Sequence, residues 1–156
     1  MTLMSTTAPS EITIDHEPYS GEDAVRLRAV ALLSAGLPPR MARTLPLASV
    51  AANLTVRNGM GEPLGYGVLS EVADGVLEIQ SFFIREDARG AGVGSALLSR
   101  LEQVAGELGS PALVHAGTPG DADITDTLLR RGYVPIAPFG AHTLVADVVC
   151  VSKILV

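Results

Sequence analysis

The sequence predicts an α/β (α+β) fold with one mixed, mostly antiparallel sheet of about six to seven strands and helices on both faces. Its 156 residues are enough for a single core. Apolar side chains alternate in some segments and recur every three to four residues in others. The resulting order is a strand, a helix, three strands, a helix, a strand, a helix and two strands.

The first elements are a strand and a helix. Residues 11–16 alternate apolar with polar side chains, as a half-buried strand does. Apolar residues then recur at helical spacing over 20–36, and Ser20 with Asp23 resembles a capping box at the start of that helix. The stretch that follows admits a second, short helix that carries Met41.

Three apolar runs come next, at 50–57, 64–72 and 75–84. Turn signals separate them at Asn58-Gly59 and Asp74-Gly75, so they predict an antiparallel meander.

The second half of the chain alternates helices and strands. Apolar residues share one stripe over 95–108, and residues 119–131 carry acidic side chains in the first turn and basic ones in the last, so both segments predict helices. Residues 112–117 predict a short buried strand between them, and 133–139 and 145–156 predict the final two strands.

The third run of the meander breaks its own alternation. Leu77 and Ile79 share one face, but the apolar side chains that begin at Phe82 are consecutive. An extra residue in the strand produces this pattern, so we predict a β-bulge near Ser81 or Phe82. Backbone groups freed by the bulge can pair with an extended ligand as an added strand would. The alternative is a strand buried on both faces near its end.

The segment RGAGVGSALL joins the meander to the next helix. After Arg89 it places glycines at alternate positions, Gly90, Gly92 and Gly94. A helix N-terminus has free amides and a partial positive charge, and without Cβ atoms an anion can approach it closely. An ordinary tight turn is the alternative, but it needs only one or two glycines. The spacing therefore favours an anion-binding loop.

Two well-known phosphate-binding loops fit this segment less well. A mononucleotide loop places a lysine after its last glycine, whereas Gly94 is followed by Ser95 and Ala96. A dinucleotide loop has its third glycine where Ser95 stands, and it normally follows the first strand of a parallel unit. A nucleotide-binding domain is therefore the weakest of the functional hypotheses.

The pattern Arg89-x-x-Gly92-x-Gly94 resembles the acyl-CoA-binding loop of the GNAT N-acetyltransferase superfamily. The order of elements from Ile12 to Val156 is similar to that fold, and LEIQSFFI, LLRRGY, APFG and VVCVSK resemble a group of small bacterial members. The resemblance implies acetyl-CoA as co-substrate, a small-molecule or peptide amine as acceptor, and a homodimer as a possible assembly. The residues that it implies for coenzyme A binding are Phe82, Phe83, Ile84, Arg89, Gly90, Ala91, Gly92, Val93, Gly94 and Ser95.

The same resemblance implies catalytic roles. Glu78 stands where many members carry a glutamate that acts as general base, and a backbone amide near Phe83 is the candidate oxyanion donor. Leu128 stands where members carry a tyrosine that donates a proton to the leaving thiolate. Solvent, Thr127 or His115 would then supply that proton. Otherwise the chain is a catalytically weak or inactive acyl-CoA-binding or sensing module.

The remaining chemically active side chains are scattered. His16, His115, His142 and Cys150 show no metal-ligand spacing, so we expect no metal site. His115 lies in an apolar strand and is expected to be a hydrogen-bonded core residue. His142 is expected in the turn between the last two strands, which lies near the acceptor site in the members that the chain resembles, and an ordinary loop residue is the favoured interpretation. The pair Arg130-Arg131 is expected to complement a helix dipole.

Composition argues against several classes of function. The chain has 17 acidic and 11 basic residues, a net charge of -6, and its basic residues form no continuous patch for nucleic acid. No apolar run approaches the ~20 residues of a membrane span, and segment 1–10 lacks the features of a secretory signal. One cysteine cannot form an internal disulfide. We therefore expect a cytoplasmic protein with a flexible tail at 1–10 and one acyl-CoA-binding domain at 11–156.

Overall fold

The elements follow one another in the order that the sequence predicts. The structure is a computed structural model that describes residues 11–38, 44–117 and 122–155, so the predicted tail at 1–10 and the short helix around Met41 lie outside the described residues. The strands and helices are β1 (Thr13–His16), α1 (Glu22–Ser34), β2 (Val50–Arg57), β3 (Pro63–Ala73), β4 (Val76–Ile84), α2 (Val93–Glu107), β5 (Ala112–Gly117), α3 (Ala122–Arg130), β6 (Val134–Ile136) and β7 (Val149–Ile154).

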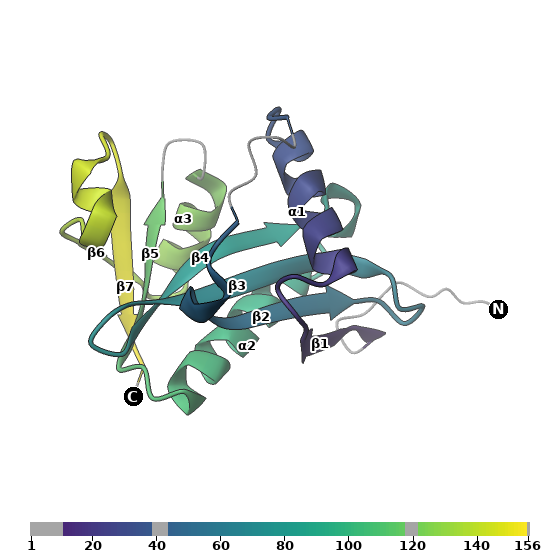
Figure 1. Ribbon diagram of the computed structural model, residues 1–156, viewed down its shortest axis with the longest axis horizontal. Helices are drawn as coiled ribbons and strands as arrows, with labels where there is room; N and C mark the ends of the chain where they lie inside the picture. Colours follow the sequence, from purple (N-terminus) through teal and green to yellow (C-terminus); the bar gives the residue numbers. More distant parts are fainter. Residues whose placement is uncertain (1–10, 39–43, 118–121, 156) are drawn as a thin grey trace.

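One seven-stranded sheet in the order β1-β2-β3-β4-β5-β7-β6 organises the molecule (Figure 1). All neighbouring strands are antiparallel except β4 and β5, which are parallel. That parallel pairing covers only Leu77 with Leu113 and Glu78 with Val114. Beyond it the two strands diverge, which leaves one edge of β4 without a strand partner.

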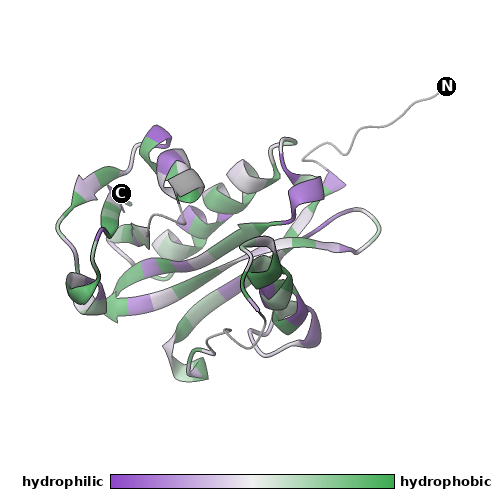
Figure 2. Ribbon diagram, turned by 90° about the horizontal axis from the view of Figure 1, so that it is seen from above, coloured by the Kyte–Doolittle hydropathy of each residue, from purple (hydrophilic) through white to green (hydrophobic). Residues whose placement is uncertain are grey.

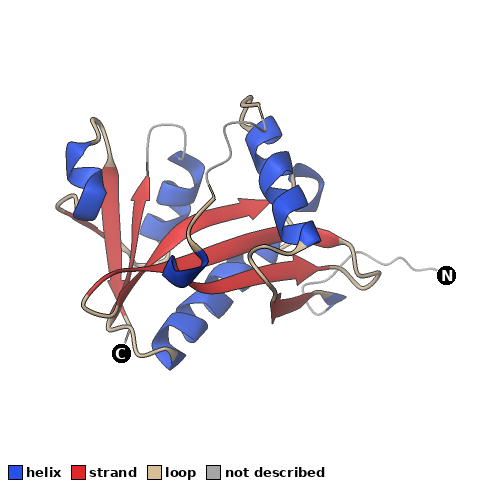
Figure 3. Ribbon diagram, viewed as in Figure 1, coloured by secondary structure: helices blue, strands red, loops and turns tan. Residues whose placement is uncertain are grey.

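Helices cover both faces of this sheet, as predicted (Figure 3). Helices α2 and α3 pack on one face, where Leu97, Leu101 and Leu128 are fully buried in the main core. Helix α1 packs on the other face, where Leu27 joins a second cluster with Tyr66 and its neighbours. Hydrophobic residues accordingly dominate the central strands (Figure 2). Burial of each such leucine stabilises the fold by roughly 1.5–3 kcal/mol.

The predicted bulge is present in β4. The register passes from Val68 opposite Ser81 to Leu69 opposite Ile79, so Gln80 is the extra residue. It lies immediately before Ser81, at the point where β4 separates from β5. The bulge explains why the apolar period of this strand breaks.

The predicted capping box of the first helix is wrong. Gly21 is the N-cap and forms no side-chain cap hydrogen bond. Asp23 instead accepts a hydrogen bond from Arg57 of β2 at 2.8 Å, and Glu17 binds the same guanidinium at 2.7 Å. A half-buried arginine with two carboxylate partners is a stronger hydrogen-bonding partner than a neutral amide, which explains the difference.

Other boundaries shift by a few residues. Helix α2 begins at Val93 rather than Ser95. Strand β7 begins at Val149 rather than at residue 145, because Asp147, within the predicted strand, adopts a left-handed conformation (φ +61°) after the 3-10 turn at Gly140–Leu144.

Within the described ranges, no helix combines the length and the apolar composition that crossing a bilayer would require. The same ranges contain no group of three or more His, Cys, Asp or Glu side chains placed to hold a metal ion.

Candidate functional site

The glycine loop forms an open start to α2. Gly90 (φ +85°) and Gly92 (φ +81°) adopt left-handed backbone conformations, which cost other residues roughly 1–2 kcal/mol each. Gly92 is the N-cap and has no side chain to accept the free amide hydrogens of the first turn. Arg89 donates from Nε to the carbonyl oxygen of Ile84 at 2.9 Å, which ties the loop to the end of β4.

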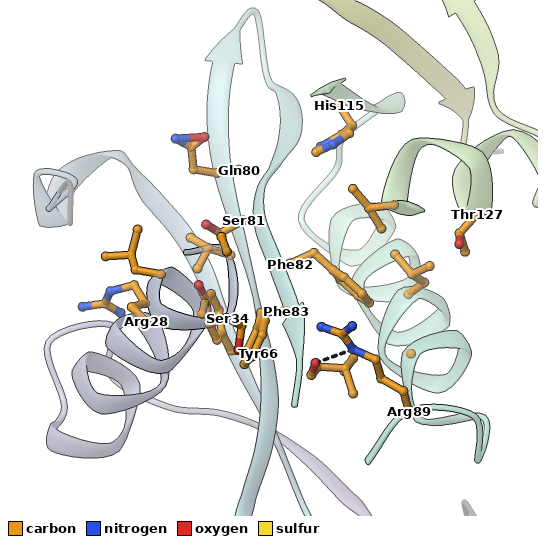
Figure 4. A pocket seen from close by; sticks show the side chains of 18 of the residues that line it. Arg28, Ser34, Tyr66, Gln80, Ser81, Phe82, Phe83, Arg89, His115 and Thr127 are labelled. Atoms are coloured by element: carbon orange, nitrogen blue, oxygen red, sulfur yellow. Dashed lines mark hydrogen bonds between the residues drawn. The ribbon is translucent and has the colours of Figure 1, made fainter. Parts of the chain in front are cut away.

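A cavity of about 1090 Å³ lies beside this loop. It occupies the region where β4 and β5 diverge, and residues from α1, α2 and α3 complete its walls (Figure 4). The glycine loop and the end of β4 therefore meet in it with the His115 region of β5, with α1 and α3, and with Tyr66 and Val68 of β3. The predicted site residues that line it are Phe82, Phe83, Ile84, Arg89, Gly90, Gly92, Gly94 and Ser95.

The end of β4 presents side chains to both faces of the sheet. Phe82 packs against the main core on the α2 side, and Phe83 belongs to the cluster on the α1 side. Phe83 lies 6.1 Å from Tyr66 between ring centroids. Figure 4 shows Arg28 and Tyr66 on one side of β4 and Arg89 on the other. The cavity therefore connects the two faces of the sheet through the gap between β4 and β5.

Glu78 lies deeper along β4 than these residues. It is 9% exposed, and its Oε2 lies 2.9 Å from Nε2 of His142. His142 comes from the turn between β6 and β7, where its ring also packs edge-on against Phe139. Glu78 is not among the described residues that line the cavity. The structure thus brings Glu78 and His142 together, although the sequence patterns gave no link between them.

His115 does line the cavity, and its surroundings define one tautomer. Its Nδ1 lies 2.8 Å from the carbonyl oxygen of Ile79, which can only accept a hydrogen bond. Nδ1 therefore carries a hydrogen, so in the neutral form of the ring Nε2 carries the lone pair. That nitrogen is buried and has no hydrogen-bond partner among the described residues. Figure 4 shows the ring at the gap between β5 and β4.

Comparison with known proteins identifies the fold. The model of the acetyltransferase (GNAT) family matches residues 37–131, more than half of the chain. The chain belongs to the GNAT acetyltransferase family. A comparison with curated proteins gave no significant match.

Solved structures share the GNAT fold over nearly the whole chain. A candidate acyl-CoA N-acyltransferase from Klebsiella pneumoniae has a TM-score of 0.79 at 23% identity, over 93% of this chain and 98% of its own. A GNAT acetyltransferase from Staphylococcus aureus has a TM-score of 0.74 at 12% identity, over 93% and 99%. A candidate acetyltransferase from Salmonella typhimurium, solved with acetyl-CoA, has a TM-score of 0.68 at 16% identity, over 94% and 95%.

Leu128 of this GNAT protein is a core residue. Its side chain is fully buried between α3 and the sheet, so it presents nothing to the cavity. Ile124 and Thr127 of the same helix line the cavity instead. Tyr133 is buried too, and its hydroxyl donates to Glu102 Oε2 at 2.8 Å. Burial and this carboxylate raise the pKa of Tyr133 well above its ordinary value.

Arg131 joins α3 to α2. It donates to Ser95 at 3.1 Å and Ser99 at 3.0 Å, and pairs with Glu102 at 3.2 Å. Arg131 lies at the end of α3, as expected. Its contacts with α2 also position the first turn of that helix.

Sequence reasoning missed the α1 side of the GNAT cavity. Tyr19, Arg28 and Tyr66 line it, and none of them belongs to a motif. Tyr66 is 5% exposed, and burial raises its pKa. The sequence signal for Tyr66 was its position between two glycines, Gly65 and Gly67. Because side chains alternate along a strand, β3 has no side chain at these two positions on one face and carries the Tyr66 ring on the other.

Proposed function

We propose that this GNAT protein transfers an acetyl group from acetyl-CoA to a primary amine of a small molecule or peptide. The observation that carries the proposal is the uncapped start of α2 beside a cavity that passes between β4 and β5. Residues 11–156 would act as one acyl-CoA-binding domain. The lone cysteine suits the reducing cytoplasm, where we expect the protein to work.

The donor would bind along the loop and the edge of β4. Amides from Gly90 to Ser95, including Ala91 and Val93, would hold the pyrophosphate, because a helix start concentrates free N–H donors and positive potential. The unpaired edge at Phe82 to Ile84 would pair with the pantetheine arm as an added strand does. This places the thioester at the gap between β4 and β5.

The reaction exchanges one acyl bond for another. The amine nitrogen bonds to the thioester carbonyl carbon, the carbon–sulfur bond breaks, the amine loses a proton and the thiolate gains one. A backbone amide on the free edge of β4 beside Phe83 would stabilise the developing oxyanion, because the hydrogen bond of Arg85 to Leu64 and the register of the two strands turn the amide of Phe83 itself toward β3. Glu78 would accept the amine proton, through water, since its carboxylate lies outside the cavity wall and is held by His142.

His115 is a second candidate for the same proton. The His115 ring lines the cavity, and its buried Nε2 has no hydrogen-bond partner among the described residues, so this nitrogen could accept the proton, after a small movement of the ring or its neighbours, and then deliver it to the thiolate. This role would replace the tyrosine that Leu128 does not supply.

Two conservative variants separate the candidate bases. Glu78→Gln keeps a hydrogen bond to His142, and His115→Asn keeps an N–H that can donate to Ile79, so each removes mainly the basic atom. The variant that lacks the general base should show a kcat about 10²–10⁴-fold lower than the wild type. Its pH–rate profile should also lose the dependence that the base causes. An unchanged pH–rate profile in either variant excludes that residue as the base.

The function itself is tested with acetyl-CoA and a broad panel of amines. Calorimetry should detect acetyl-CoA binding, and mass spectrometry should detect the acetylated amine with release of CoA. No binding at millimolar acetyl-CoA contradicts the proposal. Binding without transfer to any amine would favour the binding or sensing module, a second candidate that the burial of Leu128 supports.

A homodimer is the assembly that we propose. Val134, Ile136 and Val149 are exposed apolar side chains on β6 and β7, and β6 is an edge strand of the sheet. A second copy related by two-fold symmetry could cover this edge. Light scattering should give twice the chain mass, and Val149→Asp should give monomers.

A further inference from the structure

Arg28 occupies the wall of the cavity that faces away from the glycine loop. Helix α1 carries it over the ring of Tyr19, with its guanidinium carbon 3.8 Å from the ring centroid. This cation–π contact holds the guanidinium in a fixed plane. Figure 4 shows Arg28 on the α1 side of β4, together with Ser34 and Tyr66.

The guanidinium of Arg28 has no anionic partner within the part of the chain that the structure describes. Its Nη1 is shielded from solvent and has no hydrogen-bond partner among the described residues. Some other arginines of the described chain do pair with carboxylates, such as Arg57 with Glu17 and Arg131 with Glu102. A buried charged donor without an acceptor is costly, and because Arg28 lines the cavity, a ligand there could supply the anion that this guanidinium lacks among the described residues.

The charged residues of the cavity also favour an anionic ligand. The described side chains that line it include Arg28 and Arg89 but no aspartate or glutamate, in a chain of net charge -6. Arg89 belongs to the loop proposed for the donor phosphates and donates to the carbonyl oxygen of Ile84. Among the described residues that line the cavity, Arg28 is therefore the arginine available to the acceptor. The net charge of the chain alone would favour a cationic polyamine as the acceptor. The arginines that line the cavity instead favour an acceptor that carries an anionic group near its amine.

We propose that the acceptor is an amine that also carries a carboxylate, an amino acid in the broad sense, and that Arg28 binds this carboxylate. A single guanidinium matches a single negative charge and can bind both carboxylate oxygens at once. Neutral hydroxyls of Ser34, Ser81 and Tyr66 line the same side of the cavity. This inference rests on the proposed acetyl transfer and specifies its substrate class.

Matched pairs of amines test the inference. Phenylalanine with phenethylamine, and 4-aminobutyrate with butylamine, differ by one carboxylate, and phosphoethanolamine replaces the carboxylate by a phosphate. The purified full chain should acetylate the carboxylate member of at least one pair with a kcat/KM about 10- to 150-fold higher. A preference for the members without a carboxylate, or for phosphoethanolamine, overturns the carboxylate assignment.

Variants assign the preference to Arg28. Arg28→Met keeps the apolar stem over Tyr19 and should reduce the ratio within each pair about tenfold or more, while Arg28→Lys should restore part of it. Arg26→Met is the control, because Arg26 lies on the same helix but is exposed and pairs with Glu22. An equal loss for both members of a pair shows that Arg28 is structural and overturns the inference.

A binding measurement separates this inference from the proposed function. With CoA present, N-acetylphenylalanine should raise the Tm of the wild-type protein more than that of Arg28→Met. If no amine is acetylated but this difference persists, the transfer proposal fails and the carboxylate site stands. If transfer occurs but the difference is absent, the carboxylate site fails and the transfer proposal stands.

Discussion

Replacement of Gly94 by alanine tests the donor-binding loop without disturbing the fold. Gly94 is the second residue of α2 and is not among the residues with positive φ. An added Cβ would meet Ile84 and Phe82 at 3.8 Å, which is ordinary van der Waals contact. Because alanine favours a helix over glycine, Gly94→Ala should raise the free energy of unfolding by about 0.5–1 kcal/mol. For a domain of this size the Tm should rise by about 1–4 °C.

The affinity for acetyl-CoA should fall in the same variant, although its stability rises. Gly94 lines the cavity, so its new methyl group would hold a phosphate away from the amides of the first helical turn. Loss of one hydrogen bond to a charged group costs about 1.5–3 kcal/mol, so the Kd should rise about 10- to 150-fold. Isothermal titration calorimetry measures the Kd, and differential scanning calorimetry measures the Tm.

Two further glycine variants serve as controls. Gly106→Ala adds a Cβ to the same helix with no atom within 4 Å, so it should stabilise the protein by a similar amount and leave the Kd unchanged. Gly92→Ala places a Cβ at φ +81° and should destabilise by roughly 1–2 kcal/mol. If Gly94→Ala binds acetyl-CoA as tightly as the wild type, the start of α2 does not hold the donor phosphates and the reasoning is refuted.

Three other predictions concern buried groups. Tyr133→Phe should lower the free energy of unfolding by about 1–2 kcal/mol in urea titrations, because Glu102 loses one donor but keeps Arg131; no change would contradict this. Burial raises the pKa of Tyr66 above 10.0, so the folded state holds that proton more tightly than the unfolded chain; stability should fall as pH rises past 10 and less steeply in Tyr66→Phe. Cys150 is 2% exposed and burial raises the pKa of its thiol, so it should react with a thiol reagent only after unfolding, which absorbance shows directly.

Local patterns predicted the secondary structure and the donor side of the site. The runs at 50–57 and 112–117 match β2 and β5 residue for residue, because alternation and flanking turn residues act over a few positions only. The broken period in β4 predicted the bulge beside Ser81 for the same reason. The glycine spacing likewise favours the left-handed backbone of the loop before α2, because that geometry depends on residues adjacent in the chain.

The acceptor side could not be predicted in this way. Arg28 and Tyr66 are separated in sequence and meet only when α1 packs on the face of β3. The pairing of Glu78 with His142 joins residues 64 positions apart. The capping-box prediction failed because Arg57, a distant residue, competes for Asp23.

The sequence by itself determined the order of the elements, the GNAT loop and the bulge, since each depends on residues adjacent in the chain. Only the tertiary structure decided which side chains line the cavity, that Leu128 is core and that Arg28 has no carboxylate partner among the described residues. Side-chain burial and ion pairing depend on the packing of distant segments, and no local pattern carries that information.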